Sequence, residues 1–219
     1  MLIPAPAVLA ALERHGIRDI RGVLHVGAHD CEELPFYREG LGLADASVVW
    51  IDALPAKVAE ARGRGIPNVF EAVVGAADGQ AVVFRRTNND QSSSLLELGT
   101  HRHHHPDIEV VAEYAATTTT LDTFLAERGL DPAALDFWNL DIQGAELLAL
   151  RGGSAALAHA RAVYTEVNIE EVYRGCALLP DLDAWMDAHG LRRVLTHLTD
   201  AGWGDALYVR VKDTGDIQT

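Results

Sequence analysis

The sequence predicts an α/β fold with a mainly parallel sheet. Short apolar runs rich in β-branched residues alternate with segments of helical periodicity, as in βαβ units. Turns that carry Gly or Asp follow several of these runs, and two apolar runs close the chain as an antiparallel hairpin. With 219 residues, the chain has the length of one large domain, which we expect to span residues 1–219.

The first part of the chain predicts two strand-helix units after a lead-in of residues 1–20. Gly16 ends the leading helix, and Pro55 occupies the first turn of a later one, where proline is tolerated. In chain order we expect a helix over Ala7–His15, a strand over Val23–Val26, a helix over Cys31–Arg38, a strand over Ser47–Ile51 and a helix over Pro55–Gly63.

The pattern changes after the third strand, which is expected over Val69–Val74. Two further strands, Ala81–Arg86 and Ala115–Thr119, flank a polar segment, and we treat residues 79–120 as an insertion. Segments of this length without regular structure more often form functional lids than passive connectors. A lid is therefore expected here, and a flexible surface loop is the alternative.

The second half returns to alternating strands and helices. Gly152 and Gly153 are expected to stop one of these helices, and the tail after Val211 is expected to fray. In chain order we expect a helix over Leu121–Arg128, a strand over Leu135–Leu140, a helix from Ala145, a strand over Ala162–Val167, a helix over Leu182–His189, and the closing strands Leu191–Leu198 and Ala206–Val211.

Charge and composition narrow the classes of partner. The formal net charge of −14 repels phosphate backbones and anionic membranes, so a cationic or neutral small molecule is expected rather than nucleic acid or membrane. The chain has no apolar run of membrane-spanning length and no signal sequence, which predicts a cytoplasmic protein. Cys31 and Cys176 are expected to be free thiols. The oligomeric state stays open, with a homodimer as one alternative.

Two turns after the first strands predict a nucleoside site. Gly27 allows a close approach of the backbone to a ligand, and the next helix would offer N–H groups to an anion. Asp52 closes the second strand, near the spacing at which an acidic residue binds ribose hydroxyls. A tight turn without a ligand and a helix cap are the structural alternatives for these two residues.

The same turn argues against a dinucleotide. The G-x-G-x-x-G pattern that holds a pyrophosphate has His25, Gly27 and Asp30 at its three glycine positions here. Side chains and an acidic group would therefore meet the pyrophosphate, which disfavours a nicotinamide-dependent enzyme.

Carboxylates follow the fourth and fifth core strands. Asp141, Gln143 and Glu146 come after one strand, and Glu166 closes the next. Such groups can act as a general base, bind polar acceptors, hold a cation or cap helices. Oxygen ligands from Asp141, Glu166 and Asn168 would suit magnesium or calcium, but nothing in their spacing requires a metal.

The insertion carries a histidine cluster at residues 101 and 103–105. Histidines can bind metal or act as a base near neutral pH. Neighbouring residues in a loop rarely point the same way, so a solvated loop is the expected role and no metal site is assigned. One histidine of the lid remains a candidate proton acceptor.

Several segments, taken in order, resemble the FkbM-type methyltransferases. They are Val23–His29, Val49–Pro55, Ser92–Leu95, Thr120–Asp122, Asp141–Glu146, Tyr164–Val167 and Gly202–Gly204. The resemblance covers nearly the whole chain. It implies a single Rossmann-like domain with a seven-stranded sheet that uses S-adenosylmethionine, commonly to methylate a hydroxyl of a sugar, polyketide or similar metabolite.

By position, the resemblance also implies roles for individual residues. Asp52 would hold the ribose, Asp141 and Gln143 would face the site of transfer, and the Ser92–Ser94 run would close over cofactor or acceptor. The cofactor-binding set that we expect is Gly27, Ala28, His29, Asp52, Ala53, Val74, Ser93 and Asp141.

This chain departs from the family pattern at three positions. His25 stands where an acidic residue often opens the first motif, and Cys31 stands where glycine is common. Asp52 replaces the more frequent glutamate. We expect Asp141 and Gln143 to be catalytic, with a nucleotide-dependent oxidoreductase or a non-catalytic binding protein as the alternatives.

Overall fold

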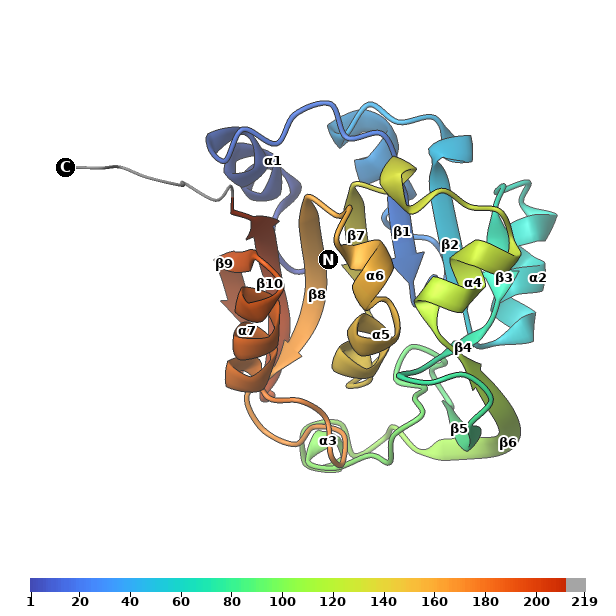
Figure 1. The fold of residues 1–219 in the computed structure, drawn as a ribbon. Coiled ribbons are helices and arrows are strands. Elements are labelled where there is room, and N and C mark those ends of the chain that lie inside the picture. The colour runs from blue at the N-terminus through green and yellow to red at the C-terminus, as the bar shows by residue number, and fades with distance from the viewer. Residues whose placement is uncertain (212–219) are drawn as a thin grey trace.

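The computed structural model describes residues 1–211 and contains a seven-stranded sheet with helices on both faces (Figure 1). The strands lie in the order β3 (Val69–Glu71), β2 (Val48–Asp52), β1 (Val23–Val26), β7 (Phe137–Leu140), β8 (Ala162–Asn168), β10 (Trp203–Arg210) and β9 (Leu191–Leu198). Neighbours from β3 to β8 are parallel, and β10 is antiparallel to β8 and β9. The predicted α/β fold with a closing antiparallel hairpin is confirmed. The expected frayed tail lies outside the described residues.

Helices cover both faces of the sheet because successive strand residues point to opposite sides and both sides are apolar. Leu24 and Val26 pack on one side, and Val23 packs on the other. The first side carries α4 (Leu121–Glu127), α5 (Glu146–Gly152), α6 (Ser154–Leu157) and α7 (Leu179–Ala188). The second carries α1 (Ala5–Arg14), the π-helix η1 (Phe36–Gly40) and α2 (Pro55–Gly63). Two short 3-10 helices, η2 (Asp45–Ser47) and η3 (Pro132–Ala134), precede β2 and β7.

The strand order reverses between β1 and β7. The chain builds outward from β1 through β2 to β3, then returns to place β7 on the other side of β1. The two strands end together, because Val26 pairs with Leu140 and the Asp141 amide donates to the Val26 carbonyl at 2.9 Å. A ligand crevice in an open α/β sheet lies at this kind of point.

The insertion forms a second, smaller sheet together with the end of the apolar run that precedes it. Its strands lie in the order β4 (Val73–Val74), β6 (Val110–Thr119) and β5 (Ala81–Thr87), and the short helix α3 (His101–His104) lies between β5 and β6 in the chain. Figure 1 shows these elements beneath the edge at which β1 and β8 end. The insertion therefore lies over the crevice.

The prediction of a helix over Cys31–Arg38 is wrong for its first half. His29 and Cys31 adopt left-handed backbone angles, with φ of 39° and 55°, which are incompatible with a helix. Helical residues begin only at Leu34, and the segment continues as the π-helix η1. The expected helix N-terminus beside Gly27 is consequently absent, and a turn stands in its place.

The predicted strand Val69–Val74 is divided at Ala72. The Ala72 amide still donates to the Asp52 carbonyl at 3.0 Å, but Val73 and Val74 pair with β6 in the smaller sheet. The strand expected over Ala115–Thr119 begins earlier, at Val110. One apolar run thus connects the main sheet to the insertion.

The helix expected from Ala145 is confirmed as α5, which begins at Glu146 and ends at the predicted stop of Gly152 and Gly153. A side chain at Gly153 would meet Leu121 and Trp138 within 3.1 Å, and the short helix α6, which was not predicted, follows this glycine. Helix α7 begins at Leu179 rather than Leu182, with a proline in its first turn.

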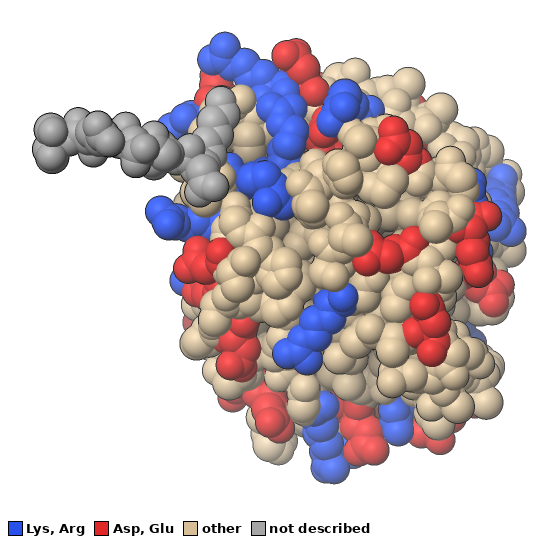
Figure 2. Space-filling view, in the orientation of Figure 1, with Lys and Arg blue, Asp and Glu red and all other residues tan. Residues whose placement is uncertain are grey.

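The surface seen in Figure 2 carries acidic and basic side chains dispersed among neutral ones, without one dominant patch. Within residues 1–211, every helix is too short or too polar to cross a membrane.

Candidate active site

Two adjoining pockets lie at the ends of the parallel strands. The first pocket opens to solvent, has an empty volume of about 590 Å³ and is lined by residues that follow β1, β2 and β7 and by β4, β5 and the insertion. The second pocket is also open, has an empty volume of about 1010 Å³ and extends toward β8 and the insertion. The residues that line both pockets are Gly27, His29, Gln91, Asp141 and Gln143. A ligand in one pocket would therefore meet a ligand in the other at this shared wall.

Most of the residues named from sequence lie in the first pocket. Its lining contains Gly27, His29, Asp52, Ala53, Val74, Ser93, Asp141 and Gln143. Ala28 is the exception, because its side chain is buried in the core on the α1–α2 side of the sheet. The structure thus brings together residues from five separate stretches of the chain, and it places Ala28 behind the pocket wall.

Asp52 joins two turns at the floor of the first pocket. One carboxylate oxygen accepts from the His29 amide at 2.7 Å, and the other accepts from the Leu54 amide at 2.7 Å. Burial raises the pKa of Asp52, while these two N–H groups oppose the rise. Each oxygen retains a lone pair, so the carboxylate can still accept from two ligand hydroxyls.

Gly27 is required by a close contact of two backbones. Its φ is 94°, and an added Cβ would lie 1.8 Å from the Asp141 carbonyl oxygen. The Gly27 and Ala28 amides both donate to the Ile51 carbonyl, at 2.8 and 3.0 Å. The glycine therefore lets the ends of β1, β2 and β7 converge.

The substitution Gly27→Ala should destabilise the fold by several kcal/mol, because a methyl group would overlap the backbone of Asp141. Gly42→Ala is the matched control, since Gly42 has a similar φ of 70° but nothing within 4 Å of an added Cβ. It should lose only about 1 kcal/mol of backbone strain. Urea unfolding of both variants measures the difference, and equal losses would contradict the role given to this contact.

Gln143 connects Asp141, which follows β7, to Glu166, which lies within β8. Its Nε2 donates to Asp141 Oδ1 at 2.6 Å and to Glu166 Oε2 at 2.7 Å. The Tyr173 hydroxyl donates to Gln143 Oε1 at 2.5 Å. A hydroxyl that donates to the amide oxygen fixes which end of the amide faces the acids. The Gln143 amide is not basic enough to take up a proton, so its role is to orient Asp141 and Glu166.

These carboxyl groups have raised pKa values. Burial and then the charge of Asp205 raise the pKa of Asp141 to about 6. Burial, followed by the charges of Asp141 and Glu146, raises the pKa of Glu166 well above its usual range. Burial also raises the pKa of Glu146 to about 7, but its Oε1 accepts from the Ile142 and Gly144 amides and caps the turn. Of these three carboxyl groups, Asp141 and Glu166 line the second pocket.

His25 supports the Gly27 turn from below. Asn139 Nδ2 donates to the Tyr37 hydroxyl at 2.8 Å, so the hydroxyl hydrogen is left to donate to His25 Nδ1 at 2.9 Å. The proton of His25 then resides on Nε2, which donates to the Gly27 carbonyl at 3.1 Å. Burial lowers the pKa of His25, which favours this neutral form. A neutral histidine thus holds the turn at the position where an acidic residue often opens the first motif.

The insertion contributes to both pockets. Ser93 lines the first pocket, whereas Ser92 and His101 line the second. The histidine cluster does not act as a unit, because His101 is buried while His103 is exposed. The expectation that the cluster is simply solvated is wrong for His101, whose neighbours sequence reasoning could not locate.

The described residues include one group with the geometry to hold a cation, formed by His29, Asp30 and Glu32. The Lys57 ammonium group lies 3.0 Å from Asp30 and already supplies a positive charge there. Between Asp141 and Glu166, the amide of Gln143 occupies the position that a shared metal would need. No residue that lines either pocket is assigned as a metal ligand.

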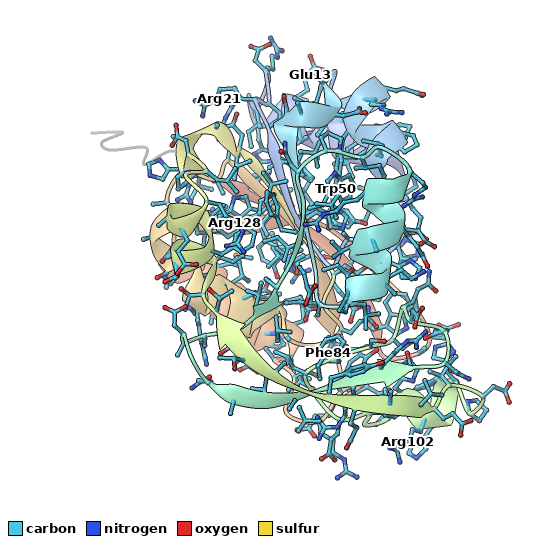
Figure 3. All side chains as sticks on the ribbon, turned by 90° about the vertical axis from the view of Figure 1, so that its right-hand side faces the viewer. Glu13, Arg21, Trp50, Phe84, Arg102 and Arg128 are labelled. Atoms are coloured by element: carbon cyan, nitrogen blue, oxygen red, sulfur yellow. The ribbon has the colours of Figure 1, made fainter. Side chains whose placement is uncertain are left out.

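Several lining residues were not assigned a site role from the sequence. Phe84, labelled in Figure 3, is a buried side chain of the insertion that forms an apolar wall of the first pocket with Leu95 and Ile142. Tyr173 and Trp203 form aromatic walls of the second pocket. Apolar residues of this kind are indistinguishable from core residues until the fold is known.

Comparison with known proteins identifies this arrangement. The family described as the methyltransferase FkbM domain matches residues 25–193, which include the carboxyl ends of β1, β2 and β7 and the insertion. The chain belongs to this family. Its motifs at Gly27, Asp52 and Asp141 therefore lie within an FkbM methyltransferase domain, as the resemblance predicted.

Individual relatives are distant. The 2-O-methyltransferase NoeI of Sinorhizobium fredii is 30% identical over 86 residues, which cover 39% of this chain and 35% of that protein. The solved structure of the methyltransferase FkbM from Methylobacillus flagellatus KT has a TM-score of 0.54 at 17% identity, over 86% of this chain and 44% of that one. An uncharacterised protein from Listeria monocytogenes serotype 4b has a TM-score of 0.50 at 9% identity, over all of this chain and 71% of that one. These structures support the fold, and this chain spans about a third to a half of the first two relatives.

Proposed function

We propose that this FkbM-family chain transfers a methyl group from S-adenosylmethionine to a hydroxyl group of a small molecule. The observation that carries the proposal is the shared wall, where Asp141 and Gln143 face both pockets. The printed activity of NoeI as a 2-O-methyltransferase also favours oxygen as the acceptor atom. Nucleic acids and membranes are not expected partners because of the chain's net charge of −14.

The first pocket fits this cofactor. Three carboxylates, Asp52, Asp90 and Asp141, line it, and its described lining contains no Lys or Arg. Asp90 is paired with Arg86 at 2.6 Å, but Asp52 and Asp141 have no Lys or Arg partner among residues 1–211, so they would repel a cofactor with phosphate groups and attract a positively charged sulfonium nucleoside. Asp52 would hold the ribose, and the apolar side chains of Val74 and Phe84 would border the adenine. This charge pattern also disfavours the oxidoreductase alternative.

The cofactor, when bound, supplies a methyl group on a positively charged sulfur that an oxygen nucleophile can attack. Asp141 Oδ1 is held by Gln143, which leaves Oδ2 to accept the proton of the acceptor hydroxyl. Its pKa of about 6 makes Asp141 a stronger base than an ordinary aspartate, yet ionised at neutral pH. Positioning of the two substrates would contribute roughly 7–11 kcal/mol, and the base roughly 10²–10⁴ in rate.

Incubation with S-adenosylmethionine that carries an isotopically labelled methyl group tests the proposal. Mixed with a low-molecular-weight metabolite fraction, the chain should produce a labelled methyl ether, detected by mass spectrometry, together with S-adenosylhomocysteine. Calorimetry should also show binding of S-adenosylhomocysteine and none of NAD. A chain that binds neither S-adenosylmethionine nor S-adenosylhomocysteine would contradict the proposal, and binding without any transfer would indicate a binding protein on this fold.

A further inference from the structure

The second pocket has an unusual charge composition. Four carboxylates line it, and no Lys or Arg belongs to its described lining. The four acidic residues are Glu32, Glu33, Asp141 and Glu166. Pockets that bind carboxylates or phosphates place Arg, Lys or unpaired N–H groups against them. An anionic ligand would therefore meet no Lys or Arg side chain in this lining.

The acids of this pocket resist further negative charge. Desolvation and the charge of Asp205 raise the pKa of Asp141, and burial with the charges of Asp141 and Glu146 raises the pKa of Glu166. An anion brought beside them would either be repelled or require an additional proton to be taken up. Glu33 is already paired with the Met1 ammonium group at 3.1 Å and keeps a lowered pKa, so it remains ionised. A ligand without negative charge avoids each of these costs.

The pocket also contains a neutral hydrogen-bond donor without a partner. Asn89 Nδ2 donates to Ser92 Oγ at 3.1 Å, and the Ser92 hydroxyl can in turn donate to His101 Nε2 at 3.2 Å. In this arrangement His101 carries its proton on Nδ1. This atom has no hydrogen-bond partner among residues 1–211, and it is shielded from solvent because the whole residue is only 6% exposed.

Burial, together with the nearby His105 and His104, lowers the pKa of His101 to about 4. His101 is therefore uncharged at neutral pH and offers an N–H group, not a positive charge. An unsatisfied buried donor costs roughly 1–3 kcal/mol, which a ligand oxygen would recover. The rings of Tyr173 and Trp203 add flat apolar walls beside it.

We propose that the second pocket selects the methyl acceptor by charge: it binds an uncharged polyol, one oxygen of which accepts from His101 Nδ1, and it excludes the same polyol bearing a carboxylate or phosphate. This inference rests on the proposed function, because it assigns the second pocket to the acceptor. It adds a specificity-determining residue from the insertion and a class of molecule that the site rejects.

Paired glycosides that differ in one carboxylate test the selection. Methyl β-glucoside and methyl β-glucuronide, and the corresponding galactoside pair, are titrated against the full chain saturated with S-adenosylhomocysteine, and binding is followed by saturation-transfer NMR. A neutral member should bind at least tenfold more tightly than its acidic partner. The double variant Glu32→Gln, Glu33→Gln should narrow that difference.

Variants of His101 test the donor. His101→Leu should weaken binding of the neutral glycoside at least tenfold without altering the affinity for S-adenosylhomocysteine, and His101→Asn should restore part of the binding because its amide can donate. His103→Leu is the matched control, since His103 lies exposed on the same short helix. Equal binding of neutral and acidic glycosides, or no binding of either to the S-adenosylhomocysteine complex, would overturn the inference. Failure to bind S-adenosylhomocysteine would instead overturn the proposed function.

Discussion

Replacement of Asp52 by alanine should weaken binding of S-adenosylhomocysteine roughly a hundredfold. The carboxylate is expected to accept from two ribose hydroxyls, and hydrogen bonds to a charged group contribute about 1.5 kcal/mol or more each, so a loss of about 3 kcal/mol corresponds to two orders of magnitude. Asp52 also holds the His29 and Leu54 amides, so part of the loss will come from disorder of these two turns. Isothermal titration calorimetry gives the affinity directly.

Two further variants separate the ribose contact from the role of Asp52 in the turns. Glu71→Ala removes an exposed carboxylate at the position that pairs with Asp52 on β3, and it should leave the affinity within about twofold, as is usual for exposed charges. Asp52→Glu keeps the carboxylate and should recover part of the binding. An Asp52→Ala variant with unaltered affinity and an unaltered melting temperature would remove Asp52 from the cofactor site.

Asp141→Asn should reduce the rate of methyl transfer by roughly 10²–10⁴, because the amide cannot accept the hydroxyl proton. The amide oxygen can still accept from Gln143, so the affinity for S-adenosylhomocysteine should change little. In the unaltered chain, the rate at saturating acceptor should fall about tenfold per pH unit below the Asp141 pKa of about 6. An unchanged turnover in Asp141→Asn would exclude Asp141 as the base.

The same variant should be more stable than the unaltered chain at pH 8. A carboxyl group whose pKa is raised on folding favours the folded state at low pH, and this contribution is lost as the pH rises through the folded pKa, here about 6. The neutral amide avoids that loss, so its melting temperature should exceed that of the unaltered chain at pH 8 and approach it near pH 4. Equal melting temperatures at pH 8 would show that Asp141 is not held at a raised pKa. Glu71→Ala again serves as the control.

The strand ends were predictable because local sequence determines them. Gly27, Asp52 and Asp141 each follow a short apolar run, and parallel strands bring their carboxyl ends to one edge. Convergence of these residues in one pocket follows from that rule without knowledge of any long-range contact. Their individual roles remain predictions, because position alone does not measure binding or turnover.

The other parts of the site could not be predicted, because they depend on contacts between segments that are distant in the sequence. The expected helix after Gly27 fails because Asp52 captures the His29 amide, and residues 29–31 adopt a turn that local propensity does not favour. Tyr173 orients Gln143 across 30 residues, and Ser92 orients His101 inside a cluster that looks uniform in the sequence. No periodicity or motif encodes such pairs, so the lining of the second pocket could not be predicted before the position of the insertion was known.

Ser92 and Ser93 are neighbours on one short length of chain, yet they face different pockets. Any movement of the Ser92–Ser93 segment that narrows one pocket must also move a wall of the other. By thermodynamic reciprocity, the methyl donor would then alter the affinity for the acceptor by the same factor as the acceptor alters the affinity for the donor. A mutation in this segment that changes the specificity for one substrate would therefore also change the affinity for the other.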